Sequence, residues 1–263
     1  MLGTNINRKL KIENDENLSP QLKIDEKIVE PSRSEKLLGV VVNDTLTWKN
    51  HLYGDDENLG LMKNLSKRAG MLRNLRKYLP NKKFKQLVSG IFTSKLIYCM
   101  SVWIGVWDIP GQLDDGNKLS MNRNDMKRLQ VLQNKVLRLE TKLDRSVPTS
   151  TLLDKSGSLS VHQLGAYHTA VHVFKISQEK KPAYHFERFF GQISQETNQL
   201  QLRSGQNVRS RTKFKLATCR GSFFYQGDRI WGSLPGSIKQ VQKMEQFKRL
   251  CKAWVKNNIN EKP

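Results

Sequence analysis

The feature that most constrains this sequence is a run of fifty residues, 58–107, with ten lysines and arginines and no aspartate or glutamate. Helices that are merely soluble usually mix both signs of charge on their surfaces, and this run cannot do so within itself. An unpaired cationic field attracts phosphate groups and makes their binding strongly dependent on salt. The run therefore predicts a polyanionic partner, nucleic acid before membrane.

The charge of the other segments and the cysteine content narrow the class of protein further. Residues 1–57 carry a net charge of −3, residues 108–200 of +3 and residues 201–263 of +11, within a total of +21. Three cysteines far apart argue against a disulfide framework or a zinc site, and no stretch reaches the ~18 apolar residues of a membrane span. We expect an intracellular protein of the nucleus or cytoplasm, neither secreted nor membrane-bound, with no small-molecule substrate.

Hydrophobic periodicity predicts a mainly α-helical fold with a short N-terminal β segment. Strands are expected where apolar residues alternate or β-branched residues cluster, at 9–12, 22–24 and 37–42. Asn124 and Asp125 are the expected N-cap of the third helix, and Ser160 that of the fourth. Apolar residues recurring at three and four predict helices over 59–79, 84–103, 126–143, 159–176 and 238–254, with loops at 108–116 and 194–215.

Short motifs follow one another in order over roughly residues 33–254. They are Leu38-Gly39-Val40-x-x-Asn43-x-x-Leu46-x-Trp48-x-x-His51, Leu65-Ser66-Lys67-Arg68, Leu75-Arg76-Lys77-Tyr78-Leu79-Pro80, Leu96-x-Tyr98-Cys99-x-x-Val102-Trp103, Leu129-Gln130-x-Leu132-Gln133-Asn134-Lys135-x-Leu137-Arg138, Pro148-Thr149, Leu152-Leu153, Leu159-Ser160-Val161 and Phe223-x-Tyr225-x-Gly227-x-Arg229-Ile230-Trp231-x-Ser233-Leu234-Pro235. This ordered series resembles the region that follows the catalytic palm in reverse transcriptases of non-LTR (LINE, jockey-like) retrotransposons. Asn43 departs from the family, which usually has an aspartate there.

The resemblance implies a division into four parts and a role in binding. Residues 1–57 would be a β hairpin segment that closes a palm, 58–145 a helical thumb, 146–200 a helical connector and 201–263 a basic C-terminal region. The palm carboxylates that hold two Mg²⁺ ions in this family precede the matching region. The resemblance therefore implies a C-terminal fragment of an RNA-directed DNA polymerase that binds template–primer RNA or DNA. It would hold no cofactor, need the remainder of the enzyme as partner and not polymerise alone.

The candidate nucleic-acid contacts are cations on the outer faces of the expected thumb helices and in the basic C-terminal region. In the C-terminal region the cations interleave with aromatic residues, which suits phosphate contact combined with base stacking. Phe223, Tyr225 and Trp231 are instead expected to pack in a turn. The candidates are Lys67, Arg68, Arg73, Arg76, Lys77, Lys82, Lys83, Lys85, Lys135, Arg138, Arg209, Arg211, Lys213 and Lys215.

Two patterns in the sequence imitate metal sites without meeting the requirements of one. Residues 53–56, Tyr-Gly-Asp-Asp, spell the metal-binding tetrapeptide of polymerases, but Glu57 and Asn58 stand where an apolar strand should follow. We expect these acids in the first turn of the basic helix, where they interact favourably with the helix dipole. His168 and His172 are four residues apart but lack a third ligand, so we expect ordinary, partly buried histidines and no metal site.

Two further hypotheses remain open. The chain could be a free-standing RNA- or DNA-binding protein derived from a mobile element with no enzymatic role, or the product of a decayed gene that does nothing. Salt-dependent binding by a folded protein favours the first of these over the second. Polymerase activity recovered by adding a palm in trans favours the enzyme fragment instead.

Overall fold

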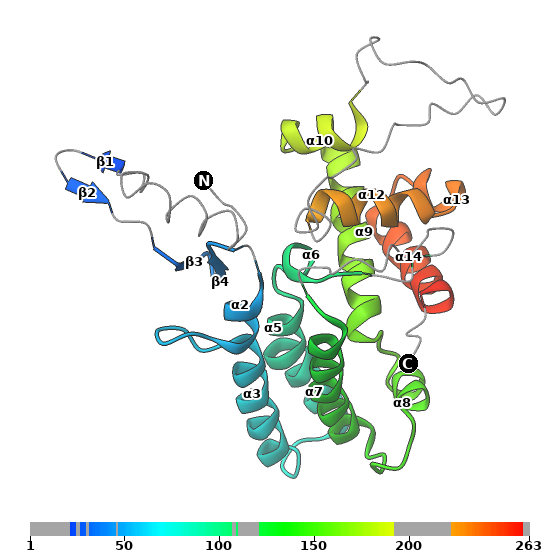
Figure 1. Cartoon of the computed structure of the whole chain (residues 1–263). Coiled ribbons are helices and arrows are strands. Elements are labelled where there is room, and N and C mark those ends of the chain that lie inside the picture. The colour runs from blue at the N-terminus through cyan, green and yellow to red at the C-terminus, as the bar shows by residue number, and fades with distance from the viewer. Residues whose placement is uncertain are drawn as a thin grey trace. The chain divides into compact units, whose positions relative to one another are not determined.

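The computed structural model describes residues 22–24, 27–29, 32–45, 47–106, 109, 121–191 and 222–259. These residues form a mainly helical fold with short antiparallel strand pairs near the N-terminus (Figure 1), which confirms the expected fold class. Contacts divide the chain into two units. Unit 1 comprises Met1–Cys99 and Arg123–Ser156, and unit 2 comprises Met100–Asn122 and Gly157–Pro263. The four-part division expected from the sequence stays a prediction.

The strands of unit 1 form two antiparallel hairpins. β1 (Leu22–Ile24) pairs with β2 (Lys27–Val29), and β3 (Ser34–Leu37) pairs with β4 (Val40–Asn43). Leu38 and Gly39 join β3 to β4 with φ angles of 46° and 84°, as a two-residue turn with two left-handed residues requires. The run 37–42 is therefore not one strand as expected, because this turn divides it. The strand expected at 9–12 lies outside the described residues.

β4 packs against α2 (Lys49–Tyr53) through a buried histidine. Nδ1 of His51 accepts a hydrogen bond from the backbone amide of Val41 at 3.4 Å. Burial and the nearby charge of Lys95 lower the pKa of His51 to about 4. The imidazole is therefore neutral at pH 7 and serves as an acceptor that joins the hairpin to the helices.

The helical core of unit 1 is built on α3 (Leu61–Leu75) and α7 (Arg123–Thr141), which lie side by side (Figure 1). Leu65 and Leu72 of α3 are completely buried, as is Leu129 of α7, which follows the expected apolar spacing. α7 begins at Arg123, so Asn124 and Asp125 lie inside its first turn and are not its N-cap. α8 (Thr149–Ser156) completes the unit and contacts α7.

The second expected helix, 84–103, is interrupted in the structure. Cys99 has a φ of 50°, a left-handed conformation that ends the helix, so the expectation of one continuous helix was wrong. Pro80 is the N-cap of the first piece, and α3 already ends at Leu75. The pieces are α4 (Asn81–Val88), the π-helical η1 (Ser89–Thr93), α5 (Ser94–Ile97) and α6 (Met100–Trp103).

Unit 2 is organised around α9 (Val161–Glu179). Ser160 caps this helix in a reciprocal capping box with Gln163, which confirms the expected start. Phe174 of α9 stacks on Phe247 with ring centroids 3.9 Å apart. The other described helices of unit 2 are α6, which contacts α9, and α10 (Ala183–Phe190), α12 (Phe223–Ser233), α13 (Gly236–Lys239) and α14 (Met244–Asn258).

Two expectations for unit 2 need correction. Phe223, Tyr225 and Trp231 are partly buried as expected, but they lie on the regular helix α12 and not in a turn. The last helix begins at Met244, because residues 236–239 form the separate short helix α13. In the part of the chain that the structure describes, no helix combines the length and the apolar character that a bilayer crossing requires.

Candidate nucleic-acid interface

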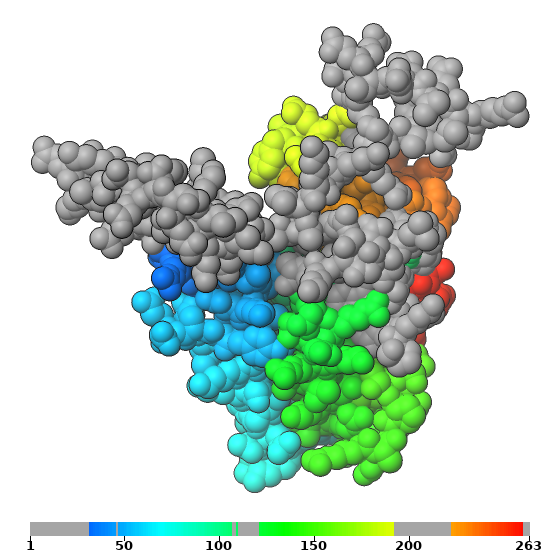
Figure 2. Space-filling model, viewed as in Figure 1, coloured from blue at the N-terminus to red at the C-terminus, as the bar shows by residue number. Residues whose placement is uncertain are grey.

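The described candidate residues all lie in unit 1, on α3, on α4, on the turn between them and on α7. Figure 2 shows the segments of α3 (cyan) and α7 (green) next to each other at the surface of this unit. Four candidates fall outside the described residues: Arg209, Arg211, Lys213 and Lys215.

Six candidates present their charge to solvent. All six are exposed, and within the described ranges none of their side chains makes an ion pair or a hydrogen bond. The ammonium of Lys77 lies 4.8 Å from the ring centroid of Tyr78, which is itself 71% exposed. These charges are free to meet phosphate groups. We call these six residues the cationic surface: Lys67, Arg73, Lys77, Lys82, Lys83 and Lys135.

Arg76, in contrast, uses its guanidinium inside the unit. Nε donates to the carbonyl of Leu139 at 2.7 Å, and Nη1 to the carbonyl of Leu79 at 3.1 Å. Nη2 donates to the side chain of Asn81 at 3.1 Å, and the group lies 4.9 Å from the ring centroid of Phe84. Arg76 therefore ties α3 to α4 and to the end of α7.

Three other candidates are also engaged by their own unit. Arg68 donates to the carbonyl of Ile91 at 2.8 Å, and Arg138 donates to two carbonyls in the segment after α7. Lys85 forms an ion pair with the buried Glu140 at 3.3 Å. These cations hold backbone segments and α7 in place, which reduces their capacity to bind a phosphate at the same time.

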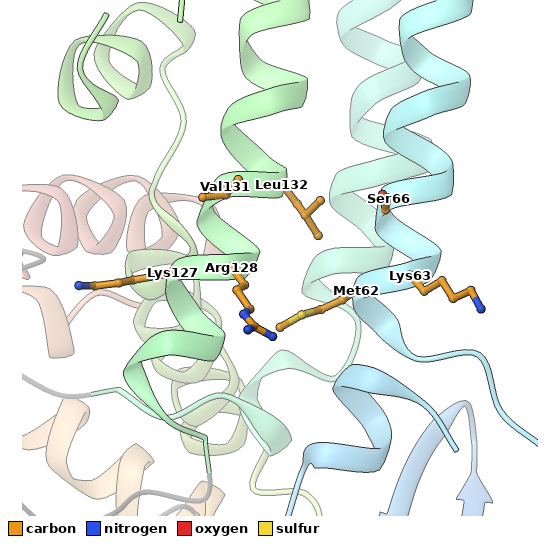
Figure 3. Close-up of a pocket in the computed structure, with 7 residues that line it drawn as sticks. All are labelled: Met62, Lys63, Ser66, Lys127, Arg128, Val131 and Leu132. Carbon is orange, nitrogen blue, oxygen red and sulfur yellow. The ribbon is translucent and has the colours of Figure 1, made fainter. Parts of the chain in front are cut away.

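A pocket between α3 and α7 adds cations that the charge count did not single out. This open pocket has a volume of about 510 Å³. In Figure 3, Met62 and Arg128 extend toward each other across it, whereas Lys63 and Lys127 extend outward on opposite sides. Its lining residues are Met62, Lys63, Ser66, Lys127, Arg128, Val131 and Leu132, with no acid among them.

Arg128 is held at this pocket by a contact with a residue seventy-five positions earlier in the sequence. The hydroxyl of Tyr53 donates to the carboxylate of the buried Asp125 and accepts from Nη1 of Arg128 at 3.0 Å. The guanidinium also lies 5.6 Å from the ring centroid of Tyr53. Burial, followed by the bond to Asp125, raises the pKa of Tyr53, so the phenol stays protonated. No local sequence signal connects these three residues.

Tyr53 ends α2, and residues 54–56 lie in the loop before α3, so the expectation that the acids of this loop occupy the first turn of the basic helix was wrong. α3 begins at Leu61 with Gly60 as N-cap and has no acid in its first turn. The Asp55 carboxylate instead accepts hydrogen bonds from the Asn58 amide at 2.7 Å and from the Ser34 hydroxyl at 2.8 Å. The bond from Ser34 is the main cause that lowers the pKa of Asp55. The acid stabilises the loop between α2 and α3.

The histidines of α9 differ in exposure: His162 is completely buried, His168 is partly buried as the sequence predicted, and His172 is exposed. Burial lowers the pKa of both His168 and His172, and the ring of His172 lies 4.7 Å from that of Phe223. Among the residues that the structure describes, no group of three or more His, Cys, Asp or Glu side chains is placed to hold a metal ion.

The arrangement is therefore suited to binding anions through the exposed cations on α3, on the turn after it, on α4 and on α7, whereas Arg68 and Arg76 bind backbone carbonyls of the same unit. No protein family, curated protein or solved structure matched the chain when it was compared with them.

Proposed function

We propose that the chain binds nucleic acid through the cationic surface of unit 1. The observation that carries this proposal is that these six side chains are exposed and unpaired within the described ranges. Each phosphate neutralised by such a cation releases condensed counterions, which favours binding at low salt. Five of the six lie within residues 58–107, which contain no acid that could pair with them locally.

The motif series extends this proposal to a specific role. We infer that the chain is the C-terminal part of an RNA-directed DNA polymerase of a non-LTR retrotransposon and holds the template–primer duplex in the nucleus or cytoplasm. The support is the ordered resemblance together with a helical unit that bears free cations. The catalytic carboxylates and their Mg²⁺ ions would belong to a palm supplied by the remainder of the enzyme.

A free-standing nucleic-acid-binding protein is the second candidate, and one observation favours it. Unit 1 has a buried core of its own, with Leu65, Phe84 and Leu129 completely buried. A binding surface supported by such a core does not need a palm to hold it in place.

The test is the salt dependence of binding by the full chain. Fluorescence anisotropy with a labelled RNA–DNA hybrid should show log Kd rising linearly with log salt, by about 0.7–0.9 for each phosphate contact. The triple variant Arg73→Gln, Lys77→Gln, Lys82→Gln should lower this slope by about two to three.

A matched control removes the same charge from exposed cations of unit 2, by Lys181→Gln, Lys243→Gln and Arg249→Gln. This control should change the slope by less than about 0.7, the contribution of one phosphate contact. Equal slopes for the two triple variants would contradict the assignment of the surface. DNA synthesis on addition of a palm in trans would favour the polymerase fragment over the free-standing protein.

A further inference from the structure

We propose that the pocket between α3 and α7 is a subsite for one unpaired nucleotide of a single strand. Lys63, Lys127 and Arg128 would contact phosphates at its rim, while Met62 and Leu132 contact the base or sugar. This inference rests on the proposed nucleic-acid binding and adds a second kind of contact, made to the base.

The size and the lining of the pocket suit a small ligand with an apolar face. Its volume of about 510 Å³ lies in the usual range for ligand pockets, roughly 300–1,000 Å³. The floor is aliphatic, because Met62 and Leu132 extend into the space between the helices (Figure 3). Val131 at the edge is 52% exposed, so part of this apolar surface remains open to water.

The charge of the pocket selects an anion. Three cations and no acid line it, and Lys63 and Lys127 have no partner within the described ranges. An uncharged apolar ligand would leave these cations unused, and a cationic ligand would be repelled. A nucleotide combines both required surfaces, because it carries a phosphate next to a flat apolar base.

Arg128 is oriented before any ligand arrives. Tyr53 accepts one N–H of the guanidinium, and Asp125 holds the tyrosine hydroxyl in turn. The other guanidinium N–H groups have no partner among the described residues, so they can donate to a phosphate. Tyr53 is therefore a positioning residue, which acts on the ligand only through Arg128.

The same geometry favours an unpaired nucleotide over a duplex. In a duplex the faces of the bases are stacked on one another and cannot contact a protein floor. A base in a single strand can place its face on the aliphatic side chains of the floor, and removing roughly 40 Å² of apolar surface from water contributes about 1 kcal/mol, which is about fivefold in affinity. The duplex would remain on the cationic surface outside the pocket.

The experiment compares two labelled single strands of equal length and charge, oligo-dT and the same strand with abasic sites, binding to the full chain. The wild type should bind oligo-dT about fivefold more tightly. Ser66→Phe fills the pocket and should abolish this preference with little change in the salt slope. The control Ser150→Phe, at an exposed position of α8, should retain the preference. Val131→Asp replaces an exposed apolar side chain of the pocket with an acid, so this variant should also reduce the preference for oligo-dT.

The role of Tyr53 has its own readout. Tyr53→Phe should weaken binding of both strands and lower the salt slope by about 0.7, one phosphate contact, whereas Tyr78→Phe should change neither. Equal binding of both strands by the wild type would overturn the nucleotide subsite and leave the proposed function standing. Absence of salt-dependent binding to any nucleic acid would overturn the proposed function itself.

Discussion

Replacing Arg76 by methionine should destabilise unit 1 without changing how nucleic-acid binding depends on salt. Methionine keeps an apolar stem but removes three hydrogen bonds, to Leu139, Leu79 and Asn81, and the contact with Phe84. Hydrogen bonds from charged groups contribute about 1.5–3 kcal/mol each and a cation–π contact about 0.5–1 kcal/mol. Because the side chain is only partly buried, we expect a loss of about 2–4 kcal/mol in the free energy of unfolding.

Urea denaturation followed by circular dichroism measures this loss as a lower midpoint at an unchanged slope. Arg73→Met is the matched control, since Arg73 lies one turn earlier, is exposed and should change stability by no more than about 0.5 kcal/mol. The salt slope of binding should fall for Arg73→Met only. A folded Arg76→Met protein with control-like stability, or with the lower salt slope, would refute the structural role of this guanidinium.

Three further predictions concern pH, close packing and helix capping. Lowering the pH from 7 to 5 should reduce the free energy of unfolding by about 2 kcal/mol through His51. The imidazole of the unfolded chain binds a proton near pH 6.5, whereas the buried imidazole of the folded chain binds one only near pH 4. Denaturation curves of His51→Gln should lack this dependence, and identical pH profiles would contradict it. Gly60→Ala places a Cβ 2.1 Å from a backbone carbon of α2 and should cost more than about 2 kcal/mol, whereas Gly70→Ala meets nothing within 4 Å and should be neutral or stabilising in the same assay. Ser160→Ala should cost about 1 kcal/mol by removing the capping box of α9, and an unchanged melting temperature would speak against that cap.

The helices that the sequence predicted well are those whose signals are local. The apolar spacing of α3 and α7 and the cap at Ser160 depend on residues a few positions apart. The interruptions were missed because they depend on single backbone conformations. Leu38 and Cys99 both have a positive φ, which leucine and cysteine rarely adopt. Their residue types therefore did not predict a turn or a helix end.

The residues of the candidate interface also fall into two groups, those that local sequence predicts and those that depend on distant contacts. Exposed lysines such as Lys67 and Lys83 follow from charge counting and helical periodicity. The internal role of Arg76 does not, because its acceptor on Leu139 is sixty-three residues away in sequence. The contact from Tyr53 to Arg128 spans seventy-five residues, so the pocket it supports emerges only from the tertiary fold.

The discontinuity of unit 1 has a consequence for biosynthesis. α3 leaves the ribosome before α7, and residues 100–122, which belong to unit 2, are translated between them. At a translation rate of about 5–20 residues per second, several seconds pass before α7 is synthesised and can cover the apolar face of α3. Throughout that interval the nascent chain already displays the lysines of α3 and α4. Under the proposed nucleic-acid binding, RNA would be able to contact these lysines before the core of unit 1 is complete, so polyanions would act on its folding as well as on its finished surface.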